Sequence, residues 1–224
     1  MTAKEQRRKR KQRSNSDSKA GMEKGLMIVV SGPAGSGKGT VNAHLLKTGN
    51  YAFSVSATTR APRPGEIDGV NYYYVSKEDF EKRISEGGML EYTEYCGNYY
   101  GTPKEEALRV IEGGKNLILE IEVEGAMNIK RAYPEAVLIM LLPPSYKKQE
   151  ERLRSRGTET EEKILARLKR AREEIAFLPK YDYVVYNEDN CDKEAAAEIE
   201  SIVRAEKSAV KRNSGAIDKF FENK

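Results

Sequence analysis

A glycine-rich loop directly after an apolar run constrains this chain more than any other feature. The run Leu26–Ser31 is apolar and β-branched, and the residues after it suit a turn and then a helix. Glycines let successive backbone N–H groups point into one concavity, and the N-terminus of the next helix adds positive charge there. The loop residues are Gly32, Pro33, Ala34, Gly35, Ser36, Gly37, Lys38, Gly39 and Thr40. The pattern predicts a strand, a phosphate-binding loop and a helix, with ATP as the ligand. A glycine-rich turn without a ligand is the alternative.

The end of this loop departs from the usual phosphate-loop pattern. Lys38 supplies a mobile positive charge for the β- and γ-phosphates. Gly39 follows where a hydroxyl that ligates magnesium is usual, and Thr40 comes one position later. The Lys-Gly-Thr ending resembles that of adenylate kinases, which implies that Mg²⁺ is held largely through phosphate oxygens and water. We therefore expect Mg²⁺ as the cofactor of ATP, without a direct protein ligand.

Apolar strands and amphipathic helices alternate along the chain. The expected strands are Leu26–Ser31, Leu117–Ile121, Val137–Leu142 and Tyr183–Tyr186. Apolar residues spaced three or four apart indicate one helix, through Ile164, Leu168, Ala171, Ile175 and Leu178. A second helix is expected after Asp192, and its buried face would carry Ile199, Ile202, Val203 and Val210. This alternation predicts an α/β fold with a mostly parallel sheet covered by helices on both faces. Residues 51–103 break the rhythm and are expected to form an inserted mixed lobe outside that sheet.

Composition narrows the chemistry. The chain has 224 residues, enough for one large domain, and no apolar run approaches the roughly 18 to 20 residues of a membrane span. Cys96 and Cys191 lie far apart, so neither a disulfide framework nor a zinc site is expected, and a reducing cytoplasm fits. His44 is the single histidine, which excludes the usual hydrolase triads and multi-histidine metal sites. Catalysis is expected to rest on lysine, arginine, carboxylates and backbone groups.

The formal net charge of +4 is unevenly distributed. Residues 1–20 hold eight basic and two acidic side chains, so the remainder carries −2. Residues 1–24 have few apolar side chains, which predicts a disordered basic tail. Nucleic acid is expected as a partner only through this tail, and a solvated leader is the simpler interpretation. Met22 lies just before the first apolar run, so a translation start there is a further hypothesis.

Two arginines around a proline indicate a second phosphate site. Arg60 and Arg63 flank Pro62, which stiffens the segment between them. Two guanidinium groups at a fixed separation suit a phosphate monoester, and Tyr72 can add a hydroxyl. Each arginine taken alone is more simply a surface residue. The pair predicts a phosphate monoester as the second substrate.

Five motifs in order make the sequence similar to the guanylate kinases over about residues 26–206. They are Gly32–Thr40, Ser54-Val55-Ser56 through Thr59-Arg60-x-Pro-Arg63, Gly65-Glu66, Gly97-Asn98-Tyr99-Tyr100-Gly101-Thr102, and Arg156-Gly157-Thr158-Glu159-Thr160-Glu161-Glu162. The resemblance implies the fold of a P-loop nucleoside monophosphate kinase. It also implies transfer of the γ-phosphoryl group of ATP to GMP, giving GDP and ADP, for GTP and dGTP supply and GMP recycling.

The resemblance also implies a division of the chain. Residues 25–211 would form the catalytic domain, with a GMP-binding lobe at about 54–103 and a helical lid at about 150–168. Residues 212–224 would be a C-terminal extension.

Site residues follow from the same resemblance. Those implied for the phosphate of GMP are Arg60, Arg63, Tyr72 and Tyr100, and those implied for the base are Ser56, Glu91, Thr102 and Glu122. A carboxylate at Glu91 can accept from the adjacent N1 and N2 donors of guanine, and hydroxyls can donate to O6. Tyr73, Tyr74 and Tyr99 are expected to be packing residues on the face opposite Tyr72 and Tyr100, because strand residues alternate.

Two acidic residues depart from the family pattern. The family has Asp-x-Asp at a strand end where this chain has Glu120-Ile121-Glu122, so both side chains are one methylene longer. Glu122 is expected to reach the guanine side, and Glu120 to position water on magnesium near Thr40. Solvated carboxylates at a strand end are the alternative.

The lid is expected to bring arginines to ATP. The resemblance places Arg152, Arg156 and Arg167 near the ATP phosphates when the lid closes, so they join Lys38 as catalytic residues. Arg154 and Arg170 are interpreted as solvated helix charges. No protein nucleophile is required, because phosphoryl transfer needs alignment and charge neutralisation.

Other functions stay open from the sequence. One is a catalytically inactive scaffold domain of the same fold, which binds phosphopeptides; another is a kinase for AMP or a ribose bisphosphate; a third is a nucleic-acid binder with a nucleotide switch. The expected partners are ATP, GMP and dGMP, with no membrane, in a cytoplasmic monomer or homodimer.

Overall fold

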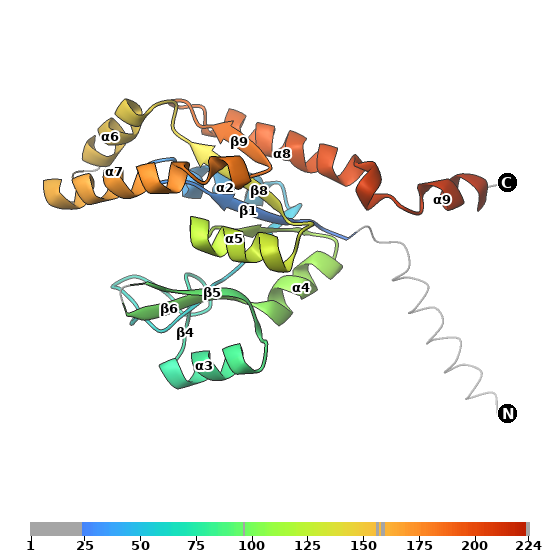
Figure 1. The fold of residues 1–224 in the computed structure, drawn as a ribbon, viewed down its shortest axis with the longest axis horizontal. Coiled ribbons are helices and arrows are strands. Elements are labelled where there is room, and N and C mark those ends of the chain that lie inside the picture. The colour runs from blue at the N-terminus through green and yellow to red at the C-terminus, as the bar shows by residue number, and fades with distance from the viewer. Residues whose placement is uncertain (1–23, 96, 156, 158–159, 223–224) are drawn as a thin grey trace.

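The computed structural model describes residues 24–95, 97–155, 157 and 160–222 (Figure 1). The predictions for the basic tail, for Arg156 and for the Thr158-Glu159 pair lie outside the described residues, apart from Lys24. No helix among the described residues is both long enough and apolar enough to cross a membrane.

The core is a five-stranded parallel sheet. Its strand order is β2-β7-β1-β8-β9. The bounds are β1 Met27–Ser31, β2 Tyr51–Phe53, β7 Asn116–Leu119, β8 Val137–Leu142 and β9 Tyr183–Tyr186. β1 lies at the centre, where it pairs with β7 on one side and β8 on the other. Because all these strands run the same way, their carboxyl ends meet at one edge of the sheet, where ligands bind in open α/β folds.

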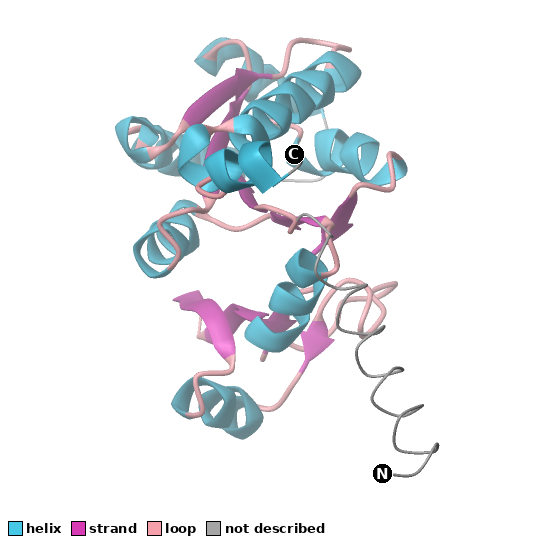
Figure 2. Ribbon diagram, turned by 90° about the vertical axis from the view of Figure 1, so that its right-hand side faces the viewer, coloured by secondary structure: helices cyan, strands magenta, loops and turns pink. Residues whose placement is uncertain are grey.

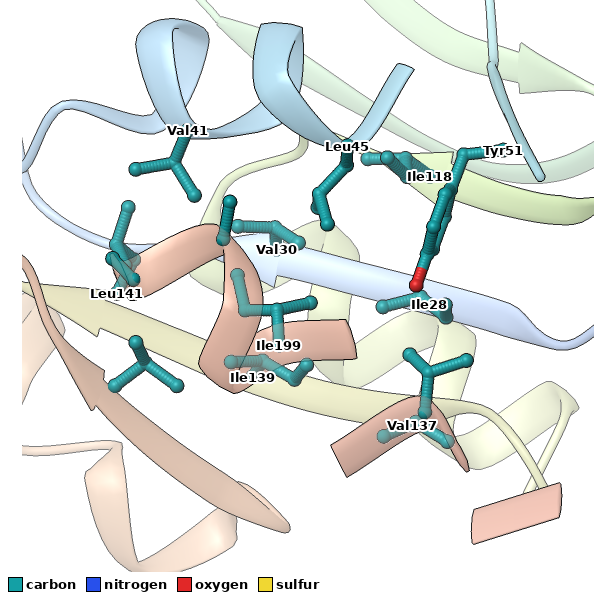
Figure 3. Close-up of a cluster of buried hydrophobic side chains, with 14 of the residues drawn as sticks. Ile28, Val30, Val41, Leu45, Tyr51, Ile118, Val137, Ile139, Leu141 and Ile199 are labelled. Atoms are coloured by element: carbon teal, nitrogen blue, oxygen red, sulfur yellow. The ribbon is translucent and has the colours of Figure 1, made fainter. Parts of the chain in front are cut away.

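Helices cover both faces of this sheet, as the alternation of apolar runs predicts. α2 (Lys38–Lys47) and α8 (Asp192–Ser208) lie on one face, and their apolar side chains pack on Ile28 and Val30 of β1 and on Ile139 of β8 (Figure 3). α4 (Lys104–Glu112) and α5 (Val123–Ala132) cover the other face and pack on Met27 and Val29. Burial of these strands on both faces explains why they read as continuous apolar runs.

A second, smaller sheet forms a separate layer below the core (Figures 1 and 2). Its order is β4-β3-β6-β5, with β3 Ala57–Thr58, β4 Tyr73–Tyr74, β5 Met89–Tyr95 and β6 Asn98–Pro103. α3 (Lys77–Ser85) packs beneath it and begins where the Ser76 side chain accepts from the backbone N–H of Asp79 at 3.0 Å. Leu90 of β5 joins the apolar cluster under α4 and α5, so this lobe is attached to the core.

Two further helices follow β8. α6 (Tyr146–Ser155) and α7 (Glu161–Ile175) pack together through Leu153, Ile164 and Leu168, and Ala34 of the glycine-rich loop packs against the same cluster. A short 3₁₀ turn, η1 (Leu178–Lys180), then leads into β9.

Four boundary predictions are wrong. The helix predicted through Leu178 ends as α7 at Ile175, and Leu178 lies in the 3₁₀ turn η1. β7 ends at Leu119, not Ile121, because the chain leaves the sheet there to enter α5. Tyr51–Phe53 is an edge strand of the parallel sheet, paired with β7, so the inserted lobe begins after it. α8 ends at Ser208, and Val210 is 87% exposed in the 3₁₀ turn η2 (Val210–Arg212) that precedes α9 (Ala216–Glu222).

Candidate active site

The glycine-rich loop joins the end of β1 to the start of α2. Gly37 caps α2 with φ of +88°, a left-handed conformation that favours glycine. A Cβ on Gly37 would lie 2.3 Å from Nδ2 of Asn187, and one on Gly32 would lie 2.1 Å from the carbonyl oxygen of Leu141. A side chain at either position would collide with these atoms, so only glycine fits there, and the two glycines set the curvature of the loop.

Lys38 lies at the mouth of this loop. Its ammonium group donates to the carbonyl oxygens of Gly32 at 2.5 Å and Pro33 at 3.3 Å. Lys38 is also the first residue of α2, so its charge adds to the positive end of the helix. The loop thus combines backbone N–H groups, a helix N-terminus and a lysine around one position for an anion.

A cavity of about 680 Å³ lies between this loop and the smaller sheet. It is lined by residues of both layers. The predicted site residues on its wall are Gly32, Ala34, Gly35, Gly37, Lys38, Gly39, Thr40, Ser56, Tyr72, Glu91, Tyr100, Glu120, Glu122 and Arg167. The predicted residues that do not line it, among those described, are Pro33, Ser36, Arg60, Arg63, Thr102 and Arg152.

Glu91 is the most deeply buried carboxylate of the cavity. It lies on β5 with 5% of its surface exposed, and the hydroxyl of Thr102 on β6 donates to its Oε1 at 2.9 Å. Burial raises the pKa of Glu91 to about 7, although the hydrogen bond from Thr102 opposes that shift. A Cβ on Gly125 of α5 would lie 2.9 Å from Oε2, so the glycine leaves room for the carboxylate. Thr102 therefore touches the cavity only through Glu91.

Arg60 is held at the edge of the smaller sheet. Its guanidinium donates to both carboxylate oxygens of Glu66 at 2.9 Å, and lies 5.6 Å from the ring centroid of Tyr72 and 5.9 Å from that of Tyr74. The backbone N–H of Arg63 also donates to Glu66 at 2.7 Å. This bond, with those from Tyr74 and Arg60, lowers the pKa of Glu66 to about 2. Both bonds to Glu66 come from Nη2 of Arg60, whereas Nη1 donates to the carbonyl oxygen of Ala61 at 2.7 Å. Arg60 therefore already contacts a pair of anionic oxygens of the kind that a phosphate offers, whereas the side chain of Arg63 is exposed.

Two of the three tyrosines predicted to be packing residues are confirmed as such, and the third lies on the other face of its strand. Tyr99 stacks on Phe80 with ring centroids 5.2 Å apart, and the hydroxyl of Tyr73 donates to Glu106, so both are packing residues as predicted. The prediction for Tyr74 is wrong, because residues two apart on a strand share a face. Tyr74 lies beside Tyr72, and its hydroxyl donates to Glu66 at 2.8 Å.

The two glutamates after β7 have different partners. Oε2 of Glu120 accepts from Nδ2 of Asn42 on α2 at 2.8 Å. Glu122 forms an ion pair with Arg170 of α7, and Arg170 also donates to Glu174 at 3.1 Å. The interpretation of Arg170 as a solvated helix charge is therefore wrong. Its position three residues after Arg167 could have indicated this, because residues three apart lie on one face of a helix. Burial raises the pKa of Glu174, against the effect of Arg170.

The remaining arginines lie around α6. Arg152 donates to the carbonyl oxygens of Asn187 at 2.8 Å and Gly35 at 3.4 Å, and forms an ion pair with Asp189. Arg154 is exposed, as predicted, and forms ion pairs with Glu150 of α6 and Glu161 of α7. Arg152 thus contacts the outer side of the loop, whereas Arg167 reaches the cavity.

The donor set of the cavity fits a hard cation carried by a ligand. Thr40 and Glu120 place a hydroxyl and a carboxylate near the loop, and oxygen is the ligand that Mg²⁺ prefers. Within the described residues, no group of three histidine, cysteine, aspartate or glutamate side chains is arranged to hold a metal. Mg²⁺ here would need oxygens from a phosphate ligand or water.

Comparisons with known proteins agree on one family. The guanylate kinase family model matches residues 24–206. A guanylate kinase of Halalkalibacterium halodurans is 53% identical over 185 residues, covering 82% of this chain and 90% of the relative. One of Clostridium tetani is 50% identical over 196 residues, covering 88% and 93%. The crystal structure of guanylate kinase from Anaplasma phagocytophilum superposes with a TM-score of 0.71 at 36% identity, covering 88% of this chain and 93% of that one. The family match spans both sheets and the whole cavity wall.

Proposed function

This chain belongs to the guanylate kinase family and is an ATP:GMP phosphotransferase, and we propose how its residues divide the transfer of a phosphoryl group from ATP to GMP. An oxygen of the GMP phosphate attacks the γ-phosphorus, the bond from that phosphorus to the β,γ-bridging oxygen breaks, and ADP leaves. Since no covalent enzyme intermediate is involved, the protein must hold the two phosphates in line and neutralise their charge.

ATP is assigned to the glycine-rich loop. The backbone N–H groups of residues 32–40 and the N-terminus of α2 would hold its phosphates, and the Lys38 ammonium would move from the carbonyls of Gly32 and Pro33 to the β- and γ-phosphates. Arg167 approaches the same phosphates from α7. The predictions for Arg152 and Arg156 as lid arginines stay proposals.

GMP is assigned to the smaller sheet. Arg60, Arg63, Tyr72 and Tyr100 would bind its phosphate, and the contact of Arg60 Nη2 with both carboxylate oxygens of Glu66 supports this, because a phosphate can offer a similar pair of oxygens. Glu91 as a carboxylate would accept from N1 and N2 of guanine. Ser56 and Glu122 complete the proposed base site, and Thr102 would act on it through its hydrogen bond to Glu91. The site would also accept dGMP.

Mg²⁺ is proposed as the cofactor, held by phosphate oxygens and water beside Thr40 and Glu120. When bound, it supplies charge neutralisation at the β- and γ-phosphates. Asn42 would orient Glu120 toward that water through its hydrogen bond. A cytoplasmic location and a monomer or homodimer remain parts of the proposal, as do the lobe at about 54–103, the lid at about 150–168 and the extension at 212–224.

One observation carries the assignment: Lys38 of the loop and Glu91 of the lobe line the same cavity. The test measures the kcat and the KM for GMP of three variants, with AMP present as a competing acceptor. Lys38→Met should lower kcat by about 10² to 10³. Arg60→Met should raise KM for GMP by about 10 to 100, the loss expected for charge-assisted hydrogen bonds. Arg109→Met, which removes an exposed arginine of α4, is the matched control and should change neither. Unchanged constants in Lys38→Met and Arg60→Met would refute the assignment.

A further inference from the structure

Three side chains from outside the glycine-rich loop hold its carbonyl groups. Nε2 of Gln149 donates to the carbonyl oxygen of Ala34 at 2.8 Å. Arg152 donates to that of Gly35 at 3.4 Å. Nδ2 of Asn187 donates to that of Ser36 at 2.9 Å. Three successive carbonyls therefore point toward α6 and the end of β9, away from the space above the loop.

The planarity of the peptide unit determines where the N–H groups of the loop point. A trans peptide is planar, and its C=O and N–H bonds point in opposite directions. A carbonyl that is held outward therefore turns the N–H of the following residue inward. The bonds to Ala34 and Ser36 thus orient the N–H groups of Gly35 and Gly37, which an anion in the loop would contact. The N–H of Ser36, which follows the carbonyl held by Arg152, donates to the carbonyl oxygen of Pro33 at 3.2 Å within the loop.

Gln149 is fully buried, and Asn187, which is 5% exposed, shares with it an amide oxygen that has no hydrogen-bond partner among the described residues. Gln149 lies on α6 and packs beside Leu153 one turn later, where both side chains would lie 3.5 Å from a Cβ on Gly35. Its Oε1 atom is buried without a hydrogen-bond partner among the described residues. An unpaired buried oxygen costs stability, and an apolar side chain of the same size would avoid that cost. The amide is therefore poorly explained by packing alone.

We propose that Gln149 is a positioning residue for ATP: its amide fixes the carbonyl of Ala34 so that the loop is preorganised to bind the phosphates. The contact with ATP is made by the loop, and Gln149 acts through it. This proposal rests on the assignment of ATP to the loop. Because Arg152 lies on the same helix and holds the next carbonyl, α6 is tied to the loop at two successive peptide units.

The test replaces Gln149 with methionine, which has a similar length and no amide. Gln149→Met should raise KM for ATP, and Kd for ATP by calorimetry, about fivefold to tenfold, the loss expected for one hydrogen bond. KM for GMP should stay unchanged, and the melting temperature should change little, because the lost bond to Ala34 and the removal of the unpaired oxygen oppose each other. This division between ATP affinity and stability is the signature that a purely structural role would not produce.

Two further variants control the test. Leu153→Met alters packing beside the same glycine without removing a donor, and it should leave KM for ATP unchanged. Gln149→Leu repeats the removal with a branched side chain, in case methionine packs poorly. An unchanged affinity for ATP in a folded Gln149 variant would overturn the proposal, as would failure of both variants to fold.

Failure of the role of Gln149 can be distinguished from failure of the proposed function. If Lys38→Met lowers kcat as expected while Gln149→Met leaves KM for ATP unchanged, only the role of Gln149 fails. If Lys38→Met leaves kcat and KM for ATP unchanged, the loop is not the ATP site, and both fail.

Discussion

Glu91 shows at the scale of one residue how function opposes stability. The proposed recognition of guanine N–H groups needs a charged carboxylate, yet Glu91 is only 5% exposed, and the hydroxyl of Thr102 donates to one of its oxygens. Burial raises the pKa of Glu91 to about 7 as a result. In the ligand-free protein the group is then half protonated near neutral pH, and binding of guanine would favour the ionised form.

Glu91→Gln should stabilise the ligand-free protein at high pH. A carboxyl whose folded pKa lies above its unfolded value of 4.5 loses stability as pH rises toward and through about 7, and a glutamine has no such loss. In urea unfolding, we expect the free energy of unfolding of the variant to exceed that of the parent by on the order of 1 to 3 kcal/mol at pH 8, and to match it at about pH 4, below the unfolded pKa. GMP affinity should fall and ATP affinity should stay.

Glu94→Gln is the control for that experiment, because Glu94 is an exposed glutamate of the same strand. Its unfolding curves should follow those of the parent at both pH values. A Glu91→Gln variant that is less stable than the parent at pH 8 would show that the carboxylate stabilises the fold and would contradict this account.

At the scale of elements, the end of α8 is fixed by one buried carboxylate. Glu206 is 7% exposed; it accepts from Tyr183 of β9 at 2.7 Å and from two nitrogens of Arg212 at 3.0 and 2.8 Å. Burial alone would raise the pKa of Glu206, but the bonds from Tyr183, Arg212 and Lys211 outweigh it and lower the pKa to about 2. η2 is thereby attached to α8 and to the carbonyl of Glu135.

Arg212→Met should destabilise the protein by about 2 kcal/mol at pH 7, because Glu206 loses two hydrogen bonds and an ion pair while it stays buried. Arg204→Met, on the exposed side of α8, should change stability by less than about 0.5 kcal/mol. A lowered folded pKa stabilises above the unfolded value, so the deficit of Arg212→Met should shrink as pH falls from about 4.5 toward 2. Equal melting temperatures for the two variants at pH 7 would disprove this role of Arg212.

At the scale of the whole molecule, two layers face one cavity. The parallel sheet contributes the loop after β1 and the glutamates after β7, and the smaller sheet contributes Glu91 and the tyrosines. Arg170 links α7 to Glu122 across the same space. Ligands that occupy both sides would draw the layers together and exclude water that would otherwise hydrolyse ATP.

Sequence patterns predicted the parallel core because its strands are buried on both faces and its helices have one apolar stripe. They failed at boundaries, where tertiary context decides: Tyr51–Phe53 pairs as an edge strand and β7 stops two residues early. Family motifs predicted residues for the two substrates, and most of these residues line one cavity, but partners made by packing carry no local signal. Nothing in the charged run around Gln149 marks that residue as buried, and a helical arginine such as Arg170 does not reveal which carboxylate it meets.

Binding of a bisubstrate ligand, in which ATP and GMP are joined through one continuous phosphate chain, tests this two-layer arrangement most directly. Calorimetry should give one ligand per chain, with an affinity at least about 10² times that of either nucleotide, because the second site is reached at high effective concentration. Lys38→Met and Arg60→Met should each weaken it. Two ligands per chain, or an affinity no greater than that of ATP alone, would contradict a shared cavity for transfer.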